Sequence, residues 1–327
     1  MPIGSGTTPI PGLAGLVDQL VAEKFSQQAA YAPALIACPL VPFNTRSGNY
    51  LTDATFKGLN LDNAPTALTA VSAHSTVYPS HLESFSSGSY SILRYAAGMF
   101  DVPDVLAAEY SAQYGVDEAA RVANALAEMC AGIHSSLVWT TLGTSGNWAS
   151  SAKADPGNIT SAAFDIIDLV EDIRTALLNN QAWAPGMDLD VFIAGDVFQH
   201  IQKLTQVLAK SGNPNSNYPT PGEVANWWAA YLPGARVHRV DSRYKAQGGT
   251  VTADFSGKIL ALPARPYPQR ACFTAVQRGA GGTTLEPMSV RNERIEAMPG
   301  TRFYADFNGG VELADNTGGY LAYDLLS

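Results

Sequence analysis

The clearest hydrophobic pattern in the chain lies at residues 117–138, where apolar positions recur three and four residues apart. This spacing predicts a helix with one buried face, and Asp117 and Glu118 suit its positive N-terminal end. At 1.5 Å per residue the helix would span roughly 33 Å, so we expect a strut across the domain. The stripe comprises Ala119, Val122, Leu126, Met129, Ile133 and Leu137. We expect Val122, Leu126, Met129 and Ile133 to form its core.

The segment before this helix is less regular. Residues 1–12 are rich in Gly, Pro and Thr and predict an arm, and residues 13–25 carry a second helical stripe. Three prolines then interrupt an apolar stretch, which favours an extended crossing segment. They are Pro33, Pro39 and Pro42.

From residue 43 to 84 apolar residues thin out, and short β-type runs flank a turn-rich centre at 58–65. This pattern predicts a long two-stranded hairpin with its tip at 58–65. An isolated hairpin is barely stable in water, so we expect this one to lie on another surface.

Residues 160–260 alternate helical and strand patterns and predict an α/β lobe. A helix is expected at 161–178, with Ala163, Ile167, Val170, Ile173 and Leu177 turned inward. A strand at 188–194 should lead through Gly195 and Asp196 into a helix ending near Lys210. Residues 211–219 read as a surface loop. Thr220, Pro221 and Glu223 match a capping box that starts another helix. Further strands are expected at 236–241, 258–263 and 271–276.

Composition adds two constraints. Charged residues make up 15% of the chain, against about 25% in ordinary globular proteins, which is typical of a surface hidden by partner subunits. The net charge of −9 argues against a protein whose main task is gripping nucleic acid. No signal peptide or transmembrane pattern is present, so a soluble intracellular product is expected.

Candidate chemistry is sparse. Cys38, Cys130 and Cys272 are far apart and form no C-x-x-C pair, which favours small core side chains in a reducing cytoplasm. The five histidines show no metal-binding spacing, so neither a metal nor another cofactor is expected. Ser150 and Lys153 fit S-x-x-K, and the segment around Ser145 misses G-x-S-x-G by one residue. Neither pattern lies in the context that the chemistry requires, and we predict no enzymatic activity.

The order of these elements resembles the major capsid proteins of tailed bacteriophages. The resemblance rests on three stretches: Trp148 with the acidic, apolar segment 164–173, the strand–turn–helix pattern at 187–198, and the segment from Pro221 to Tyr244. It implies an α+β fold with an N-terminal arm, an extended loop named the E-loop, a peripheral P-domain with a long spine helix, and an axial A-domain.

The resemblance also implies a division of the chain. Residues 1–42 would form the arm and first helix, and residues 43–84 the E-loop. Residues 85–160, with the spine helix at 117–138, and the return strands and tail at 258–327 would form the P-domain. Residues 161–257 would form the A-domain.

The implied function is a structural subunit that assembles with itself into hexamers and pentamers, which close an icosahedral or prolate shell around double-stranded DNA. The implied partners are further copies of the chain, a separate scaffolding protein, a portal and decoration proteins, with DNA touched non-specifically and no membrane. The location would be the virion capsid, and the host cytoplasm during assembly. One alternative is an encapsulin-like compartment that encloses protein cargo, and another is an intracellular α/β serine hydrolase using Ser145 or Ser150.

Inter-subunit contacts are expected at the E-loop and at basic residues of the axial lobe. The candidates are Phe43, Arg46, Tyr50, Phe56, Lys57, Tyr78, Arg236, Arg239 and Arg243. Some family members join an E-loop lysine covalently to a neighbour's asparagine, and here Lys57 with Asn292 or Asn308 would be the pair. We expect Lys57 to make an ion pair or to be solvated instead.

Overall fold

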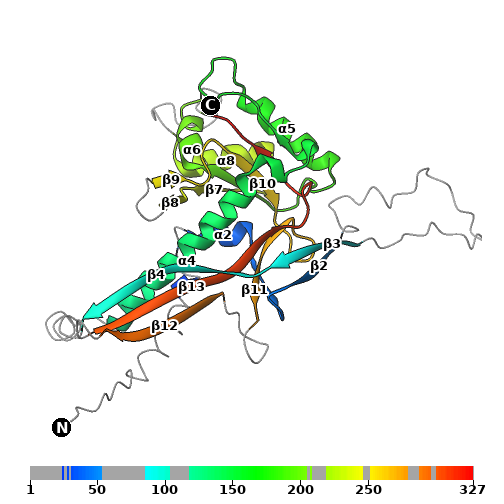
Figure 1. Cartoon of the computed structure of the whole chain (residues 1–327). Helices are drawn as coiled ribbons and strands as arrows, with labels where there is room; N and C mark the ends of the chain where they lie inside the picture. Colours follow the sequence, from blue (N-terminus) through cyan, green and yellow to red (C-terminus); the bar gives the residue numbers. More distant parts are fainter. Residues whose placement is uncertain are drawn as a thin grey trace, which may run out of the picture.

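The computed structural model describes residues 24–25, 28, 31–53, 85–103, 118–204, 207, 219–245, 251–278, 287–295 and 300–326. The molecule is elongated, with a lower part of long strands and an upper lobe of helices around a second sheet (Figure 1). One long helix, α4 (Glu118–Gly143), runs diagonally from the lower part into the upper lobe.

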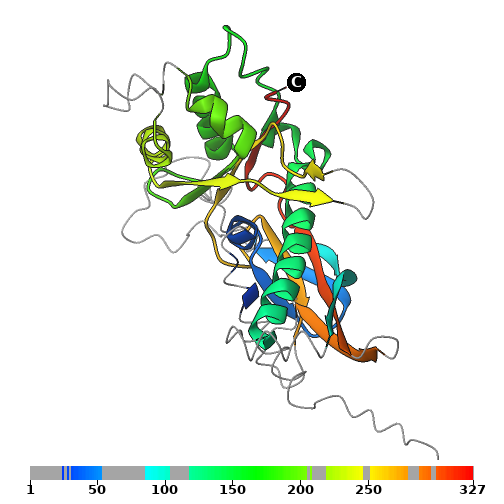
Figure 2. The same cartoon turned by 90° about the vertical axis from the view of Figure 1, so that its left-hand side faces the viewer.

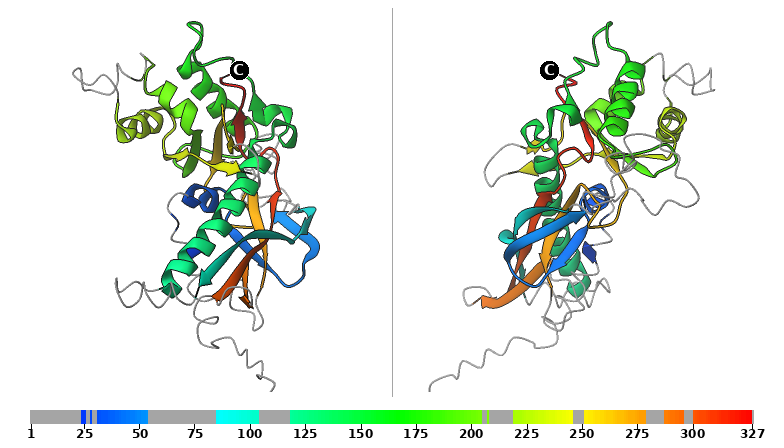
Figure 3. Two further views of the ribbon diagram at one scale, coloured as in Figure 1. Left: turned by 60° about the vertical axis from the view of Figure 1, so that its left-hand side comes forward. Right: turned by 90° about the vertical axis from the view of Figure 1, so that its right-hand side faces the viewer.

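The lower sheet is built around the longest strand, β13. Its neighbours pair in the order β1-β11-β13-β12, and β4 also pairs with β13. The strands are β1 (Leu40–Phe43), β4 (Leu93–Pro103), β11 (Cys272–Gln277), β12 (Met288–Ile295) and β13 (Gly300–Leu313). β1 runs parallel to β11, whereas β4, β11 and β12 run antiparallel to β13. Helix α4 lies across one face of this sheet (Figures 2 and 3).

The contact between α4 and the sheet follows the two periodicities of the sequence. Val122 and Leu126 are buried on the helix, Met129 and Ile133 are partly buried, and all four pack against the same cluster. Phe303, Ala305 and Phe307, at alternate positions of β13, face them from the sheet. Leu126 has no exposed surface, so it lies at the centre of this core.

α4 is longer than the predicted 117–138. Thr140 and Thr141 are β-branched and weaken the sequence signal, but Trp139 and Leu142 continue the apolar stripe and are buried in the core of the upper lobe. Burial at this end therefore extends the helix to Gly143.

The upper sheet has the order β5-β14-β10-β6-β7. Its strands are β5 (Lys153–Ala154), β6 (Leu189–Ala194), β7 (Ala235–Val240), β10 (Ile259–Pro263) and β14 (Tyr320–Ala322). Helices α5 (Ile166–Asn179), α6 (Gly195–Ile201) and α8 (Pro221–Tyr231) surround it. Every residue of β6 and β10 is buried, in keeping with their nearly continuous apolar runs. The capping box at Thr220 is present, as predicted.

Several predicted boundaries are wrong. α5 begins at Ile166 because the Asp165 side chain caps it, so Ala163 lies before the helix and is exposed. The segment read as extended contains helix α2 (Ala32–Ala37), which Pro33 opens rather than breaks because a proline in the first turn loses no hydrogen bond. α6 ends at Ile201, and of the residues between there and Lys210 only Val207 is described as helical.

The sheets do not follow the predicted domain limits at residues 160 and 257. β5, β10 and β14 come from the ranges assigned to the P-domain, yet they pair in the same sheet as β6 and β7. The upper core therefore combines residues from both sides of these limits.

Candidate assembly surfaces

A two-stranded stem leaves the lower sheet where the E-loop is expected. β2 (Ser47–Asp53) pairs antiparallel with β3 (Phe85–Ser91), from Ser47 opposite Ser91 to Asp53 opposite Phe85. The second strand thus begins at the residue after the predicted limit of 84. The predicted tip at 58–65 lies outside the described residues.

The base of this stem is held by an aromatic cluster. Phe43 stacks on Tyr90 with ring centroids 4.0 Å apart, and Tyr50 meets Phe273 edge-on at 5.0 Å. Tyr267 packs against Phe273 at 5.2 Å. Tyr50 and Tyr90 are buried, so the stem is fixed to β1 and β11 at its base.

Two glycines allow this packing. A Cβ atom on Gly88 would lie 2.7 Å from Cε1 of Tyr50 and nearer still to Cζ and Oη. A Cβ atom on Gly310 would overlap the carbonyl oxygen of Ser91, where the end of β3 crosses β13. Both positions need a residue without a side chain.

Two predicted contact residues lie in this aromatic cluster. Tyr50 is buried within its own chain, which leaves its ring little surface for a neighbour, whereas Phe43 is only partly buried against Tyr90. Arg46 is exposed, and its Nε donates to Oε1 of Gln277 at 3.3 Å. Phe56, Lys57 and Tyr78 lie outside the described residues.

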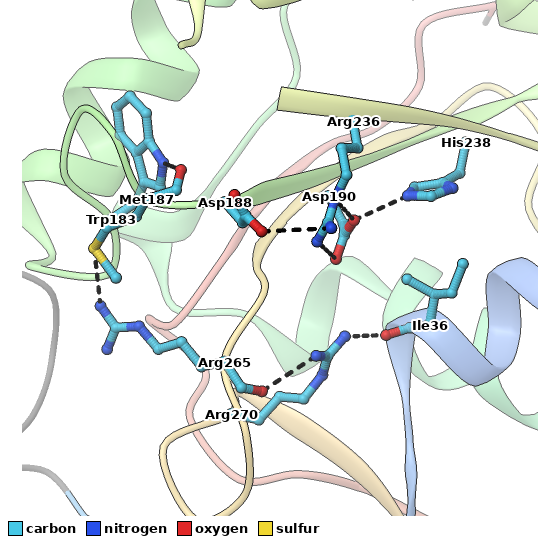
Figure 4. Close-up of polar contacts among 9 residues, drawn as sticks. All are labelled: Ile36, Trp183, Met187, Asp188, Asp190, Arg236, His238, Arg265 and Arg270. Atoms are coloured by element: carbon cyan, nitrogen blue, oxygen red, sulfur yellow. Dashed lines mark hydrogen bonds and ion pairs between the residues drawn. The ribbon is translucent and has the colours of Figure 1, made fainter. Parts of the chain in front are cut away.

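The basic residues of β7 are already paired inside the chain (Figure 4). Arg236 donates to the buried Asp190 at 3.1 Å and makes an ion pair with Asp188 at 3.4 Å, and His238 lies 2.9 Å from Asp190. Arg239 pairs with Asp241 at 2.7 Å. Of Arg243 only the backbone, in strand β8 (Arg243–Lys245), is described. The carboxylate of Asp190 therefore joins the parallel strands β6 and β7.

A cavity of about 640 Å³ lies beside this group, between α2 and the upper sheet. Arg236 lines it together with two further arginines, which bind backbone oxygens: Arg265 donates to Ala182 at 2.8 Å, and Arg270 donates to Ile36, Ala37 and Arg265. Figure 4 shows the Arg270 guanidinium between the backbone oxygens of Ile36, in α2, and Arg265. The guanidinium groups of Arg265 and Arg270 thus hold separate segments of the chain together.

The face of β4, β13 and β12 opposite α4 was not singled out from the sequence. Asp306 lies buried beneath two arginines, with Arg94 at 2.7 Å and Arg291 at 3.4 Å. Arg302 makes two hydrogen bonds to Asp101, at 2.6 and 2.8 Å, and these lower the pKa of the Asp101 carboxyl. Met99 stands exposed on this face opposite Tyr304 of β13, whereas the exposed Leu93 pairs with Gly309 and lies on the other face of β4. Side chains of a strand alternate between its two faces, so the residues of β13 between Phe303, Ala305 and Phe307 point to this outer face. That alternation of apolar and polar residues is the sequence signal that could have identified it.

The candidate catalytic residues show no such arrangement. Nζ of Lys153 donates to the backbone oxygen of Ser145 at 2.6 Å, and the Ser150 side chain is exposed. His134 is buried and lies 2.9 Å from Oγ1 of Thr274, and burial lowers its pKa to about 3. Among the described residues, no group of His, Cys, Asp or Glu side chains could hold a metal ion. Within the same residues, no helix has the length and apolar character needed to cross a bilayer.

No protein-family model matches the sequence, and no curated protein matches it either. Solved structures do share its fold. A phage-related protein from Bordetella bronchiseptica RB50 has a TM-score of 0.69 at 14% identity, over 94% of this chain and 97% of that one. The capsid of an empty GTA particle gives 0.54 at 14% identity, over 90% of each chain. A virus-like particle from Pyrococcus furiosus gives 0.51 at 10% identity, over 94% and 97%.

None of these three neighbours is described as an enzyme. At such low identities the likeness establishes the fold, and it does so over nearly the whole chain. The chain therefore has the α+β fold of the major capsid proteins of tailed bacteriophages.

Proposed function

We propose that this chain is the structural subunit of a phage shell, which assembles with itself into hexamers and pentamers that enclose double-stranded DNA. The observation that carries the proposal is a capsid fold shared over 90% or more of the chain with both the phage-related protein and the GTA capsid. The described geometry supports a structural role, because its polar side chains join strands rather than converge on a reaction centre.

The proposed contacts are head-to-tail, with one surface of a subunit against a different surface of the next. Such contacts close into rings, and small changes of angle allow rings of both six and five. The stem of β2 and β3 supplies one surface, fixed at its base by Tyr50 and Phe273. The outer face of β4, β13 and β12 supplies a second, where Met99 is exposed among paired charges. Obligate interfaces of this kind bury about 2,000–5,000 Å².

The partners follow from this proposal. We place a separate scaffolding protein, a portal and decoration proteins around the shell, in the host cytoplasm during assembly and in the virion afterwards. The net charge of −9 suits a lining that must release its DNA.

A compartment for protein cargo is the second candidate, favoured by the fold shared with the virus-like particle from Pyrococcus furiosus. The contents of purified particles separate the two. Nuclease-protected DNA supports the phage shell, and nucleic-acid-free particles containing a second protein support the compartment.

A serine hydrolase is disfavoured by the local geometry. The ammonium group of Lys153 is bound to a backbone oxygen, and not to the hydroxyl of Ser150. Ser145→Ala and Ser150→Ala, made together, should leave particle formation intact. Loss of a measurable ester hydrolysis in this variant would instead favour the hydrolase.

The proposal is tested by electron microscopy of the full chain, expressed alone and together with the genes that flank its own. We expect closed particles in at least one of these preparations. Small oligomers in both would overturn the proposal.

A loop variant tests the proposed use of the hairpin. Residues 54–84 are replaced by a short Gly/Ser turn, which keeps the stem strands. The variant should fold but not assemble. A control variant in which the same Gly/Ser turn replaces residues 211–218 should assemble normally. Normal particles from the first variant would remove the hairpin from the mechanism.

A further inference from the structure

Two of the three cysteines lie side by side, although they are far apart in the sequence. Cys38 precedes β1 and Cys272 begins β11. The parallel register pairs Leu40 with Thr274, and the N–H of Thr274 also donates to Pro39, so the chain between α2 and β1 runs beside the start of β11 and brings Cys38 next to Cys272. Neighbouring strands are about 4.7–4.9 Å apart, which is within the Cα separation of about 4.4–6.8 Å that a disulfide spans.

The backbone around the two thiols is held on both sides. Thr274 donates its N–H to Pro39 at 2.9 Å and its hydroxyl to the carbonyl of Cys38 at 3.3 Å. Arg270 donates to the carbonyl of Ala37 at 3.2 Å, and the Cys272 thiol contacts the same oxygen at 3.1 Å. These bonds fix the spacing between the end of α2 and the start of β11.

The side chains share one fully buried site. Both residues have no exposed surface and belong to one core cluster, and the two thiols are close enough to shift each other's pKa. Burial raises the pKa of Cys38, whereas the hydrogen bond from Cys38 and the nearby Arg270 guanidinium lower the pKa of Cys272. Cys130 is buried in a different cluster, where burial raises its pKa to about 12.

We propose that Cys38 and Cys272 form an intramolecular disulfide when the protein meets an oxidising environment, which fastens α2 and β1 to β11. The oxidant is a small-molecule disulfide such as oxidised glutathione. The Cys272 thiolate attacks one of its sulfur atoms, forms a mixed disulfide and releases one glutathione thiolate. The Cys38 thiolate then attacks the Cys272 sulfur and releases the second.

The balance of this exchange is complete. The protein loses two thiol protons and two electrons, and one molecule of oxidised glutathione becomes two of reduced glutathione. Access of the oxidant requires local opening of the six-residue helix α2, whose Ala34 and Ala37 are buried in the same core cluster as the two thiols. The moment of oxidation would be the release of a shell from the reducing cytoplasm, and this part rests on the proposed function. The formation of the disulfide itself does not depend on that function.

The test is a thiol count on the purified full chain, whether it is assembled or not. The protein is incubated with oxidised or reduced glutathione, quenched in acid, denatured, alkylated and weighed as intact protein. After oxidation we expect one alkylated thiol in place of three, and a peptide pair joined through Cys38 and Cys272. Three alkylated thiols after prolonged oxidation, or glutathione adducts without the linked peptides, would overturn the proposal.

Matched variants locate the bond. Cys130→Ala should still lose both remaining thiols, whereas Cys38→Ala and Cys272→Ala should yield no internal link. Oxidation should also raise the thermal midpoint of wild type and of Cys130→Ala, because the cross-link restricts the unfolded chain. A link that involves Cys130 would contradict the assigned pair. Because the count does not require a shell, its failure is distinguishable from failure of the proposed function.

Discussion

Replacing Gly88 by alanine should loosen the hairpin stem from the body of the subunit. The new methyl group would overlap the ring of Tyr50, at 2.7 Å from Cε1. Tyr50 is 7% exposed and stands edge-on against Phe273, so its ring has no open space into which to turn. Either the stem shifts or Tyr50 leaves the aromatic cluster.

The cost can be estimated from similar overpacked sites. Adding a methyl group to a well-packed core costs about 1–3 kcal/mol, and the same free energy corresponds to a factor of roughly 5–150 in an opening equilibrium. Amide hydrogen exchange of the stem strands should accelerate by that factor. The assay is mass spectrometry of peptides that cover 47–53 and 85–91, since Trp139, Trp148, Trp183 and the other tryptophans lie in the upper core and would not report on the stem.

A double-mutant cycle isolates the steric cause. In a Tyr50→Ala background the ring is absent, so Gly88→Ala should add almost nothing to the exchange rate. Gly222→Ala is the control, because the nearest heavy atom to its new methyl group would be 4.0 Å away. Equal acceleration by Gly88→Ala in both backgrounds would refute the reasoning.

Three further outcomes are expected. Leu126→Asp places an unpaired carboxylate in the core beneath α4 and should cost about 4 kcal/mol or more in urea unfolding, whereas Asn124→Asp on the exposed face should be nearly neutral. Burial holds the pKa of His134 at about 3 in the folded state, so the unfolded chain binds the extra proton and stability falls as pH drops below 6.5. Between pH 7 and pH 5 this amounts to about 2 kcal/mol, which should disappear in His134→Gln; an unchanged pH profile in that variant would show that the histidine does not cause the loss. Denatured wild-type and Lys57→Arg particles should both run at the monomer mass of 34.6 kDa, and a ladder of multimers confined to wild type would demonstrate covalent cross-linking.

Patterns confined to one element were readable in the sequence. The stripe through Leu126 predicts the spine helix, and the pairing of Thr220 with Glu223 predicts the start of α8, because neighbours within a few residues decide both. The apolar run of β6 likewise predicts a buried strand. The α+β capsid fold itself was recognised from the order of such elements.

Contacts between distant segments could not be read in this way. Arg236 is predicted from the sequence as an inter-subunit contact, and only the parallel pairing of β6 with β7 makes it the partner of Asp190 within the chain. Tyr50 looked like an exposed loop aromatic because nothing nearby in the sequence signals Phe273. Cys38 and Cys272 were read as separate core residues for the same reason.

Strand β13 has a mechanical consequence. At about 3.4 Å per residue its 14 residues extend roughly 48 Å without a break. It pairs with β4 and β12 over its first part and with β11 at its end, and β11 in turn pairs with β1. A pull along this axis loads the ladder hydrogen bonds in shear, so they must fail together rather than one after another. In the proposed shell, outward pressure from packed DNA would be carried along the single backbone of β13, from Gly300 at one end of the lower sheet to Leu313 beside β11, near the base of the hairpin stem.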